Sequence, residues 1–244
     1  MGRSYQTEAI VLRSLRFGEA DRILHLYTRE RGRIGAIAKG IRKTKSRVGA
    51  RLEPLSHVRL QLHEGSGELQ TVTGVDLISA HRATREQSYR LGVGLIGAEA
   101  MLRLFGEPEA NERAFTALAR FLDLLDDAPV DTERPALDPL VLSFQLKLLW
   151  VAGYLPHLTS CVECGHAELV GFSPRAGGAV CRAHARGSFT LSAEALTGIE
   201  VLLSTPLAAA AAAGLGDRAR GEALTVVTSS YEEHGGFRLR TLSA

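Results

Sequence analysis

Residues 23–39 read ILHLYTRERGRIGAIAK, and the pattern of this stretch decides the fold of the first part of the chain. Apolar residues alternate with other residues in 23–28 and again in 33–39, and such a period of two is typical of β-strands. Arg31-Gly32-Arg33 lies between the two runs, where a central glycine suits a tight turn. The stretch therefore predicts two consecutive strands joined as a hairpin.

Three further segments before residue 80 have the same character. Residues 7–12, 58–63 and 68–75 are short, rich in Val, Ile, Leu and Thr, and bounded by turn residues. Glu64-Gly65-Ser66-Gly67 fits a hairpin turn between the last two. Five short strands in so short a stretch favour a small closed barrel of the OB type, so we expect an OB-fold domain over residues 1–80.

After residue 85 the apolar period becomes that of helices. Two stripes at this spacing are Phe115, Leu118, Ala119, Leu122 and Leu125, and Leu140, Phe144, Leu148 and Val151. Such stripes are typical of helix faces that pack into a core. Asp138-Pro139 predicts the start of one of these helices, because an N-cap acid followed by proline suits the first turn.

A later helix is expected to begin at the N-cap Ser192. We predict an interruption near Thr205-Pro206 and a continuation through the alanine run 208–213, with Gly235-Gly236 ending the helix that follows. The chain is thus expected to be an α+β multidomain protein. Its helical domain would comprise residues 81–155 and residues 191–244.

All three cysteines of the chain fall between these two helical parts. Cys161 and Cys164 form a CxxC motif, and after sixteen residues Cys181 and His184 repeat its spacing. Two such knuckles can present four ligands to one tetrahedral ion, and Cys₃His is a closed ligand set that suits structural zinc. We therefore expect residues 156–190 to form a zinc module that stabilises the fold and does not catalyse a reaction.

Two alternatives to this ligand set stay open. His166 follows the first CxxC motif and could compete with His184 as the fourth ligand. The thiols could also be reduced and partly buried, with a histidine nearby by chance.

Charge is strongly segregated along the chain. The window 31–51 holds eight basic residues and no acid, although the formal net charge of the whole chain is only +2. Residues 1–60 carry fourteen Lys or Arg against five Asp or Glu, whereas residues 61–244 carry fifteen against twenty-two. Such a window indicates a polyanionic partner, the alternative being a solvated lysine-rich loop.

The centre of this basic window is expected to be a flexible loop. Residues 39–47 follow the third predicted strand, so their charges could follow a phosphate backbone. Tyr5, Phe17 and Tyr27 are the aromatic residues of the first sixty positions. Because few aromatic platforms are available for bases, the sequence favours electrostatic, sequence-tolerant binding of nucleic acid.

Enzyme and membrane classes find little support in the residues. Residues 35–40 begin like a phosphate-binding loop, but Ile41-Arg42 stands where Lys and Ser or Thr are required. The chain contains no HExxH or GxSxG motif, and no HxE paired with PCxxC. We expect a non-enzymatic, cytosolic protein with no membrane partner, because no apolar run approaches the length of a membrane span.

Several motifs in one order resemble the RecO recombination mediators of bacterial DNA repair. Residues 18–24 are similar to the family's GExDRIL segment, and residues 39–47 to its KGxRRxKSR loop. Residues 153–165 resemble its GYxPxLxxCxxCG stretch, and Gly177-Gly178 before Cys181 also fits. The family has a fourth cysteine where this chain has His184. Asp21-Arg22 of the first motif is expected to have a structural role within the barrel.

This resemblance implies an N-terminal OB-fold, a helical domain and a zinc module in a bacterial, cytoplasmic, nucleoid-associated protein. It also implies binding of single- and double-stranded DNA, annealing of complementary strands, and help in loading RecA onto DNA coated with single-strand-binding protein (SSB). The implied protein partners are RecR and the C-terminal tail of SSB. Carried onto this chain, the DNA contacts are Lys39, Arg42, Lys43, Lys45 and Arg47, with Arg51 as a further candidate.

Two readings from other classes stay open. One is an RNA-binding or ribosome-associated OB-fold zinc protein, and the other is a zinc-containing nuclease or modifying enzyme. The residues that would receive the SSB tail are also open. An acidic, apolar tail would need a basic residue beside an apolar groove, and the candidates in the helical part are Arg82, Arg90, Arg103, Arg113 and Arg120.

Overall fold

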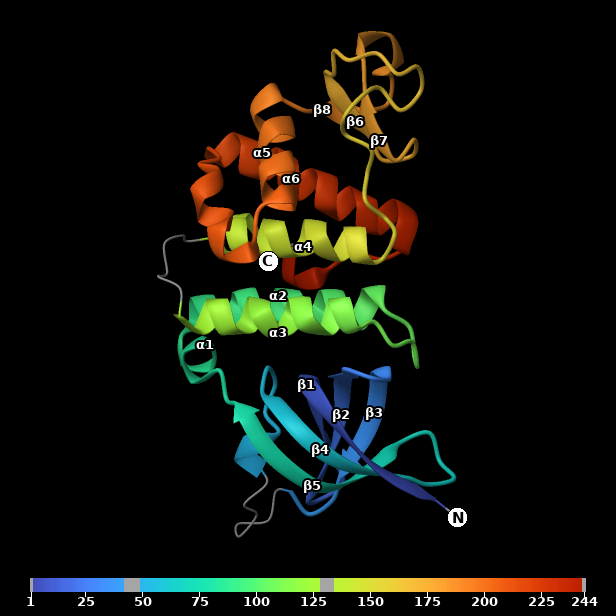
Figure 1. Cartoon of the computed structure of the whole chain (residues 1–244), viewed down its shortest axis with the longest axis vertical. Coiled ribbons are helices and arrows are strands. Elements are labelled where there is room, and N and C mark those ends of the chain that lie inside the picture. The colour runs from blue at the N-terminus through green and yellow to red at the C-terminus, as the bar shows by residue number, and fades with distance from the viewer. Residues whose placement is uncertain (1, 42–48, 128–133, 243–244) are drawn as a thin grey trace. The chain divides into compact units, whose positions relative to one another are not determined.

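The structure is a computed structural model, and it describes residues 2–41, 49–127 and 134–242 (Figure 1). The chain divides into two compact units, Met1–Ala128 and Pro129–Ala244. This boundary falls inside the range 81–155, which we had expected to be one stretch of a helical domain. Helices from the first half of that range lie in the first unit, because they pack on the barrel.

The described residues of the first unit form five strands and three α-helices. The strands are β1 (Arg3–Phe17), β2 (Asp21–Thr28), β3 (Gly32–Ala38), β4 (His57–Glu64) and β5 (Gln70–Ser79), and a short 3-10 helix, η1 (Gly49–Arg51), precedes β4. The helices are α1 (Arg82–Glu86), α2 (Ser88–Leu104) and α3 (Glu112–Asp127). The predicted strands are all present, and β4 and β5 are joined through the predicted glycine-containing turn.

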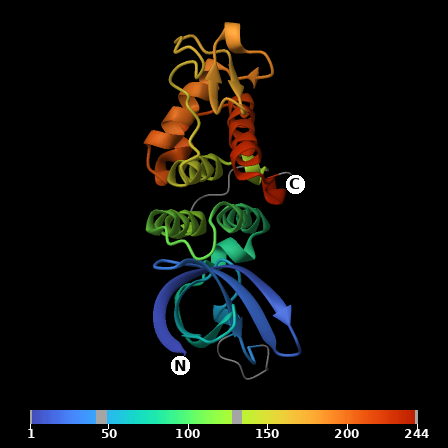
Figure 2. The ribbon, with the colours of Figure 1, turned by 90° about the vertical axis from the view of Figure 1, so that its right-hand side faces the viewer.

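The five strands form a closed barrel in the order β1-β2-β3-β5-β4, which confirms the OB-type fold. All pairs are antiparallel except β3 and β5, which meet in parallel at Ala36–Gln70 and Ile37–Thr71. The strands curve around a common interior (Figure 2). Side chains that alternate along them, including Val11, Leu24 and Ala36, fill that interior.

Strand β1 is longer than the expected segment 7–12. Its first half pairs with β4 and its second half with β2, and its register shifts between Val11 and Arg13. One strand can therefore serve two neighbours and close the barrel, as a bulge permits a strand to bend. The sequence did not reveal this length, because polar residues such as Ser14 and Arg16 interrupt the apolar pattern of the second half.

Helices α2 and α3 pack on the barrel through aromatic contacts. The ring of Tyr27 in β2 lies edge-on to Phe105, with 5.6 Å between the ring centroids, and His57 in β4 meets Phe115 in α3 in the same way. The stripe predicted in α3 is confirmed, since Phe115, Leu118 and Leu122 are fully buried. These contacts make the barrel and its helices one unit.

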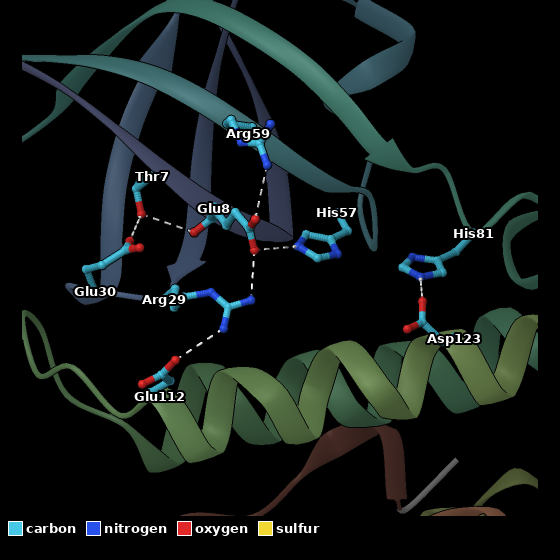
Figure 3. A network of polar contacts seen from close by, with 9 residues as sticks. All are labelled: Thr7, Glu8, Arg29, Glu30, His57, Arg59, His81, Glu112 and Asp123. Atoms are coloured by element: carbon cyan, nitrogen blue, oxygen red, sulfur yellow. Dashed lines mark hydrogen bonds and ion pairs between the residues drawn. The ribbon is translucent and has the colours of Figure 1, made fainter.

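Polar contacts link the barrel to α3 as well (Figure 3). Arg29 donates to Glu8 at 2.8 Å and to Glu112 at 3.2 Å, so that one guanidinium joins β1 to the start of α3. The Nδ1 atom of His81 lies 2.7 Å from the carbonyl oxygen of Leu55, and its Nε2 lies 3.1 Å from Asp123. His81 therefore lies between the segment before β4 and α3, with one ring nitrogen at each contact.

The network around Glu8 predicts a dependence of stability on pH. The hydrogen bond from Arg29 lowers the pKa of Glu8, and although burial opposes this, the charge of Arg29 and a hydrogen bond from Arg59 lower it further. A carboxyl group whose pKa is lowered on folding stabilises the fold above its unfolded pKa of about 4.3, and that stability is lost as the pH falls through the folded value.

We therefore expect acidification below about pH 4.3 to weaken the first unit by on the order of 1 kcal/mol through Glu8. The variant Glu8→Gln should lack this pH-dependent stabilisation, and at neutral pH it should be less stable than the wild-type protein. Amide hydrogen exchange in β1 and α3, measured between pH 6 and pH 3 with rates corrected for intrinsic exchange, would check it. An identical pH response of the two proteins would contradict the assignment.

The second unit combines a helical part with a small sheet. Its helices are η2 (Pro135–Leu137), α4 (Pro139–Val151), η3 (Arg182–His184), α5 (Ala193–Ser204), η4 (Leu207–Ala213), α6 (Asp217–Ser230), the π-helical turn η5 (Tyr231–Gly235) and η6 (Arg240–Leu242). The strands β6 (Gly171–Ser173), β7 (Gly178–Val180) and β8 (Phe189–Thr190) form a three-stranded sheet in the order β7-β6-β8. In the described part of the chain, no helix has the length and apolar character that a membrane crossing requires.

The predicted helix starts are confirmed. Asp138 accepts a hydrogen bond from the backbone of Leu140 at 2.8 Å, and Ser192 accepts one from Ala195 at 3.2 Å. The expectation for the alanine run was wrong in one respect, since residues 207–213 form a 3-10 helix and not a continuing α-helix. Pro206 lacks a backbone donor, so the chain restarts there as a tighter and shorter element.

Candidate metal centre and nucleic-acid interface

The small sheet of the second unit positions the Cys/His motif. Strands β6 and β7 form an antiparallel hairpin, and Cys181 follows directly after β7. The chain around the first CxxC lies along the other edge of β7. The amide of Ala179 donates to the carbonyl of His157 at 2.7 Å, and the amide of Val162 donates to the carbonyl of Ala179 at 3.0 Å. The two halves of the motif are thus brought to one end of the same strand.

Four side chains meet at this end of β7. The ligand atoms of Cys161, Cys164, Cys181 and His184 all lie within 4.8 Å of one another. The Nδ1 atom of His184 lies 3.4 Å from the Cys181 sulfur and 3.7 Å from the Cys161 sulfur, and the Cys164 and Cys181 sulfurs lie 3.8 Å apart. A tetrahedral zinc ion with bonds of about 2.3 Å to sulfur and about 2.0 Å to nitrogen would place its ligands about 3.5–3.8 Å apart. The cluster therefore has the size of a tetrahedral metal site.

The turn after Cys161 has the tight backbone that a metal knuckle needs. The amide of Gly165 donates to the carbonyl of Cys161 at 2.7 Å, and the amide of Cys161 donates to the carbonyl of His166 at 2.8 Å. Gly165 has a φ of +74°, a conformation that favours glycine. The ring of His166 instead accepts a hydrogen bond from the backbone of Glu168 at 3.1 Å. The geometry therefore brings His184, and not His166, to the three cysteines.

The protein environment favours the thiolate form of Cys161 and Cys181. For Cys164 a backbone hydrogen bond is outweighed by burial and by its sulfur neighbours, so its pKa is raised. Burial opposes ionisation of Cys161, but hydrogen bonds from the backbone at Cys181, Glu163 and Cys164 outweigh it and lower the pKa of Cys161 to about 6. A hydrogen bond with His184 lowers the pKa of Cys181, and contacts with Cys181 and Cys161 raise the pKa of His184. A cation that binds here would replace the imidazolium proton as the partner of the thiolates.

The donor set also restricts which ion fits. Three sulfurs and one imidazole nitrogen match a borderline-soft ion of tetrahedral preference and suit calcium or magnesium poorly. All four positions are filled by protein atoms, so such a site has no open position for a reacting water. The group can hold a metal ion, and its arrangement is that of a structural centre.

The second candidate site is the basic window after β3. Lys39 is exposed at the end of that strand. Arg51 is half-buried and donates to the carbonyl of Val75 at 3.0 Å, so its guanidinium anchors η1 to β5. The predicted contacts Arg42, Lys43, Lys45 and Arg47 lie outside the described residues.

The Asp21-Arg22 motif makes contacts at both ends of the segment that carries this window. The Asp21 carboxylate accepts a hydrogen bond from the backbone of Gly40 at 2.7 Å, and Gly40 has a φ of +65°. Arg22 donates to Ser14 at 3.3 Å and to Glu53 at 2.9 Å. These contacts confirm a structural role for the motif, which fixes where the basic segment leaves the barrel and where it returns.

Comparison with known proteins shows which family the chain belongs to. Residues 1–81 match the family model described as "Recombination protein O N terminal", and residues 85–243 match "Recombination protein O C terminal". The chain is 41% identical over 181 residues to a DNA repair protein RecO of Rubrobacter xylanophilus, covering 73% of this chain and 70% of that one. It is 33% identical over 237 residues to a DNA repair protein RecO of Anaeromyxobacter, covering 94% and 91% respectively.

Proposed function

Because the chain belongs to the RecO family of DNA repair proteins, we propose that it binds single- and double-stranded DNA, anneals complementary strands and, with RecR, helps to load RecA onto SSB-coated DNA. It would do so as a binding protein and not as an enzyme. The observation that carries this proposal is the position of the basic window, whose eight cationic residues begin and end on a closed OB barrel. OB barrels commonly bind nucleic acid strands.

Annealing has a physical basis in such a window. Two complementary strands repel each other through their phosphates, and a cationic loop lowers this barrier when it neutralises phosphates. Contacts to phosphate leave the base edges free to find their complements. Lys39, which is exposed where β3 ends, and the segment 42–48 would supply these charges.

The metal in this proposal is zinc, held by Cys161, Cys164, Cys181 and His184. The cluster has the size and the donors of a Cys₃His zinc site. When bound, the ion would cross-link the start of the small sheet to the chain after β7. Its role would be to keep this part of the second unit folded.

The acidic, apolar SSB tail would need a cation on a helical surface. Of the five candidate arginines, Arg82, Arg103, Arg113 and Arg120 are exposed. Arg82 lies 3.9 Å from Glu86, and Arg90 donates to the carbonyl of Asp126. We therefore favour Arg103, Arg113 and Arg120, on α2 and α3, for contact with the tail.

Strand annealing tests the proposal directly. The wild-type protein should speed the pairing of two complementary labelled oligonucleotides at low salt, and this gain should shrink at least tenfold when Lys39, Arg42, Lys43, Lys45 and Arg47 are replaced by Gln. Pairing is followed by fluorescence energy transfer between the labels. An unchanged annealing rate in the variant would refute the assignment to this loop, and tighter binding of RNA than of DNA with the same sequence would favour an RNA-binding role.

A further inference from the structure

A continuous apolar row crosses the outer face of the barrel. In the strand register, Leu15 of β1 lies opposite Ile23 of β2, and Ile23 lies opposite Ile37 of β3. Directly opposed residues share a face of the sheet. Their chain neighbours Leu24, Ala36 and Ala38 belong to the barrel core, so the row points outward. All three of its side chains are half-buried, which leaves part of each apolar surface in contact with solvent.

Phe17 extends this row at one end. It lies two residues after Leu15 on the same face of β1 and is 51% exposed. The other two aromatic residues in the first sixty positions are engaged elsewhere. The guanidinium of Arg31 lies 3.7 Å from the ring centroid of Tyr5, and Tyr27 is fully buried. Phe17 is therefore the aromatic ring of the barrel that a ligand can reach.

Cations border the apolar row on both sides. Lys39 directly follows β3, two residues after Ile37, and Arg13 precedes Leu15 by two residues on the outer face of β1. Both are exposed, and within the described residues neither forms an ion pair. Asp21 lies beside Phe17, but its carboxylate already accepts the hydrogen bond from Gly40. The face is apolar along its middle, with cations at two of its borders and the hydrogen-bonded Asp21 carboxylate beside Phe17.

Gly35 has no side chain, so Leu69 can pack closely against the outer face of β3 at this position. Gly35 stands opposite His25 in the β2–β3 register, and a Cβ atom added to it would lie 2.7 Å from the Cδ2 atom of Leu69. Leu69 precedes β5 and is 38% exposed, so it adds apolar surface beside the row. The platform thus runs from Phe17 across three strands to Leu69.

We propose that this outer face, with Phe17, Leu15, Ile23 and Ile37, contacts the bases of single-stranded DNA. The inference rests on the proposed function and deepens it, because it adds base contacts to phosphate contacts. Phe17 stacks on one base, the aliphatic row covers the next, and Lys39 and Arg13 meet the phosphates on either side. Stacking on an aromatic ring tolerates any base, since each base has a π-face.

Charge and shape favour this occupant over a peptide. A single strand presents flat, apolar base faces and a row of negative phosphates, and the platform has one aromatic ring and several aliphatic side chains with cations at its borders. In double-stranded DNA the base faces are stacked on each other, so the same platform would gain nothing from a duplex. The proposal therefore predicts a preference for strands whose bases are accessible.

The test compares three DNA probes by fluorescence anisotropy at one salt concentration: a single strand of mixed sequence, an abasic strand of the same length, and a duplex. The wild-type protein should bind the mixed strand about fivefold or more tighter than the abasic one. Phe17→Ala should lose most of this difference, Phe17→Trp should keep it, and duplex binding should stay unchanged in both variants. Leu77→Ala is the matched control, because Leu77 is 43% exposed on β5 but lies six residues beyond the β3–β5 contact at Thr71.

A second measurement does not depend on a variant. A strand with one 2-aminopurine should change its fluorescence when the wild-type protein binds, since stacking on Phe17 alters the emission of the base. The inference is overturned if the mixed and abasic strands bind equally, or if Phe17→Ala behaves like Leu77→Ala. Failure of the wild-type protein to bind any of the three probes would instead overturn the proposed function.

Discussion

Replacing Cys161 by Ser is expected to release the metal and to unfold residues 157–191 while the helices of the second unit persist. The sheet in this segment has strands of three, three and two residues. The cluster at the cysteines consists of Cys161, Val180 and Cys181, with Leu169 and Ala185 packed against it, and the other buried apolar side chains of the segment are Phe172, Ala179 and Leu191. So few apolar side chains cannot offset the entropy of ordering about 35 residues. The metal must supply the difference, and structural zinc contributes on the order of 10 kcal/mol in small peptides.

The helical part should survive because its own contacts hold it. Ser143 and Lys147 of α4 donate to the carbonyls of Leu202 and Leu203, at 2.8 Å and 2.6 Å, and so cap the end of α5. Neither contact involves the metal cluster. Partial unfolding, confined to one segment, is therefore the expected result.

Metal analysis and hydrogen exchange would check this prediction. The wild-type protein should contain about one zinc per chain, and the Cys161→Ser protein should contain nearly none. Amides of β6 and β7 should lose their protection in the variant, and in the wild type after treatment with a chelator, whereas α4 and α6 should keep theirs. His166→Ala is the matched control and should retain both metal and protection, because His166 lies outside the cluster. Protected β6 and β7 amides in metal-free protein would contradict a structural role for the ion.

The metal cluster and the strands could be predicted from sequence because their signals are local. The repeated spacing from Cys161 to Cys164 and from Cys181 to His184 brings the ligands of each knuckle together within one turn. Sequence could not choose between His166 and His184, since both follow a knuckle closely. The choice came from a backbone contact, the hydrogen bond that Glu168 donates to the ring of His166.

Pairing between strands that are distant in the chain could not be predicted from the sequence. Closure of the barrel needs β1 to pair with both β2 and β4, and the bulge between Val11 and Arg13 that allows it leaves no mark in the apolar pattern. The outer row was missed for a related reason. Ile23 and Ile37 are apolar like their neighbours in the barrel core. A strand that is apolar on both faces has the same sequence pattern as a fully buried strand, and only the strand register shows which face is exposed to solvent.

Replacing Lys39, Arg42, Lys43, Lys45 and Arg47 by Gln is expected to remove most of the salt dependence of DNA binding. If about six cations of the wild-type protein meet phosphates of a single strand, the logarithm of affinity falls with the logarithm of salt at a slope of about −4. Between 50 and 200 mM salt this slope lowers the affinity about 300-fold. With about one contact left, the variant should lose only about threefold over the same range.

A control with the same change in charge separates position from net charge. Five exposed arginines away from the basic window are Arg103, Arg113, Arg120, Arg175 and Arg186. Their replacement by Gln lowers the net charge equally, so it should weaken long-range attraction slightly and keep the steep slope. Anisotropy titrations of the wild-type protein and the two variants at four salt concentrations would give the three slopes to compare. A slope that flattens equally in both variants would mean that phosphate contacts are spread over the surface and do not concentrate on this loop.

The slope also distinguishes the two kinds of contact inferred for the barrel. Loss of a phosphate contact changes the slope, because fewer counterions are released on binding. Loss of the Phe17 ring removes a base contact and no charge, so Phe17→Ala should lower the affinity at every salt concentration and leave the slope unchanged. Because Lys39 directly follows β3, two residues after Ile37, both effects would arise at the end of one strand. A protein that binds phosphates near the loop and stacks base faces on the adjacent surface can hold a single strand with its base edges accessible. Pairing with a complementary strand requires accessible base edges.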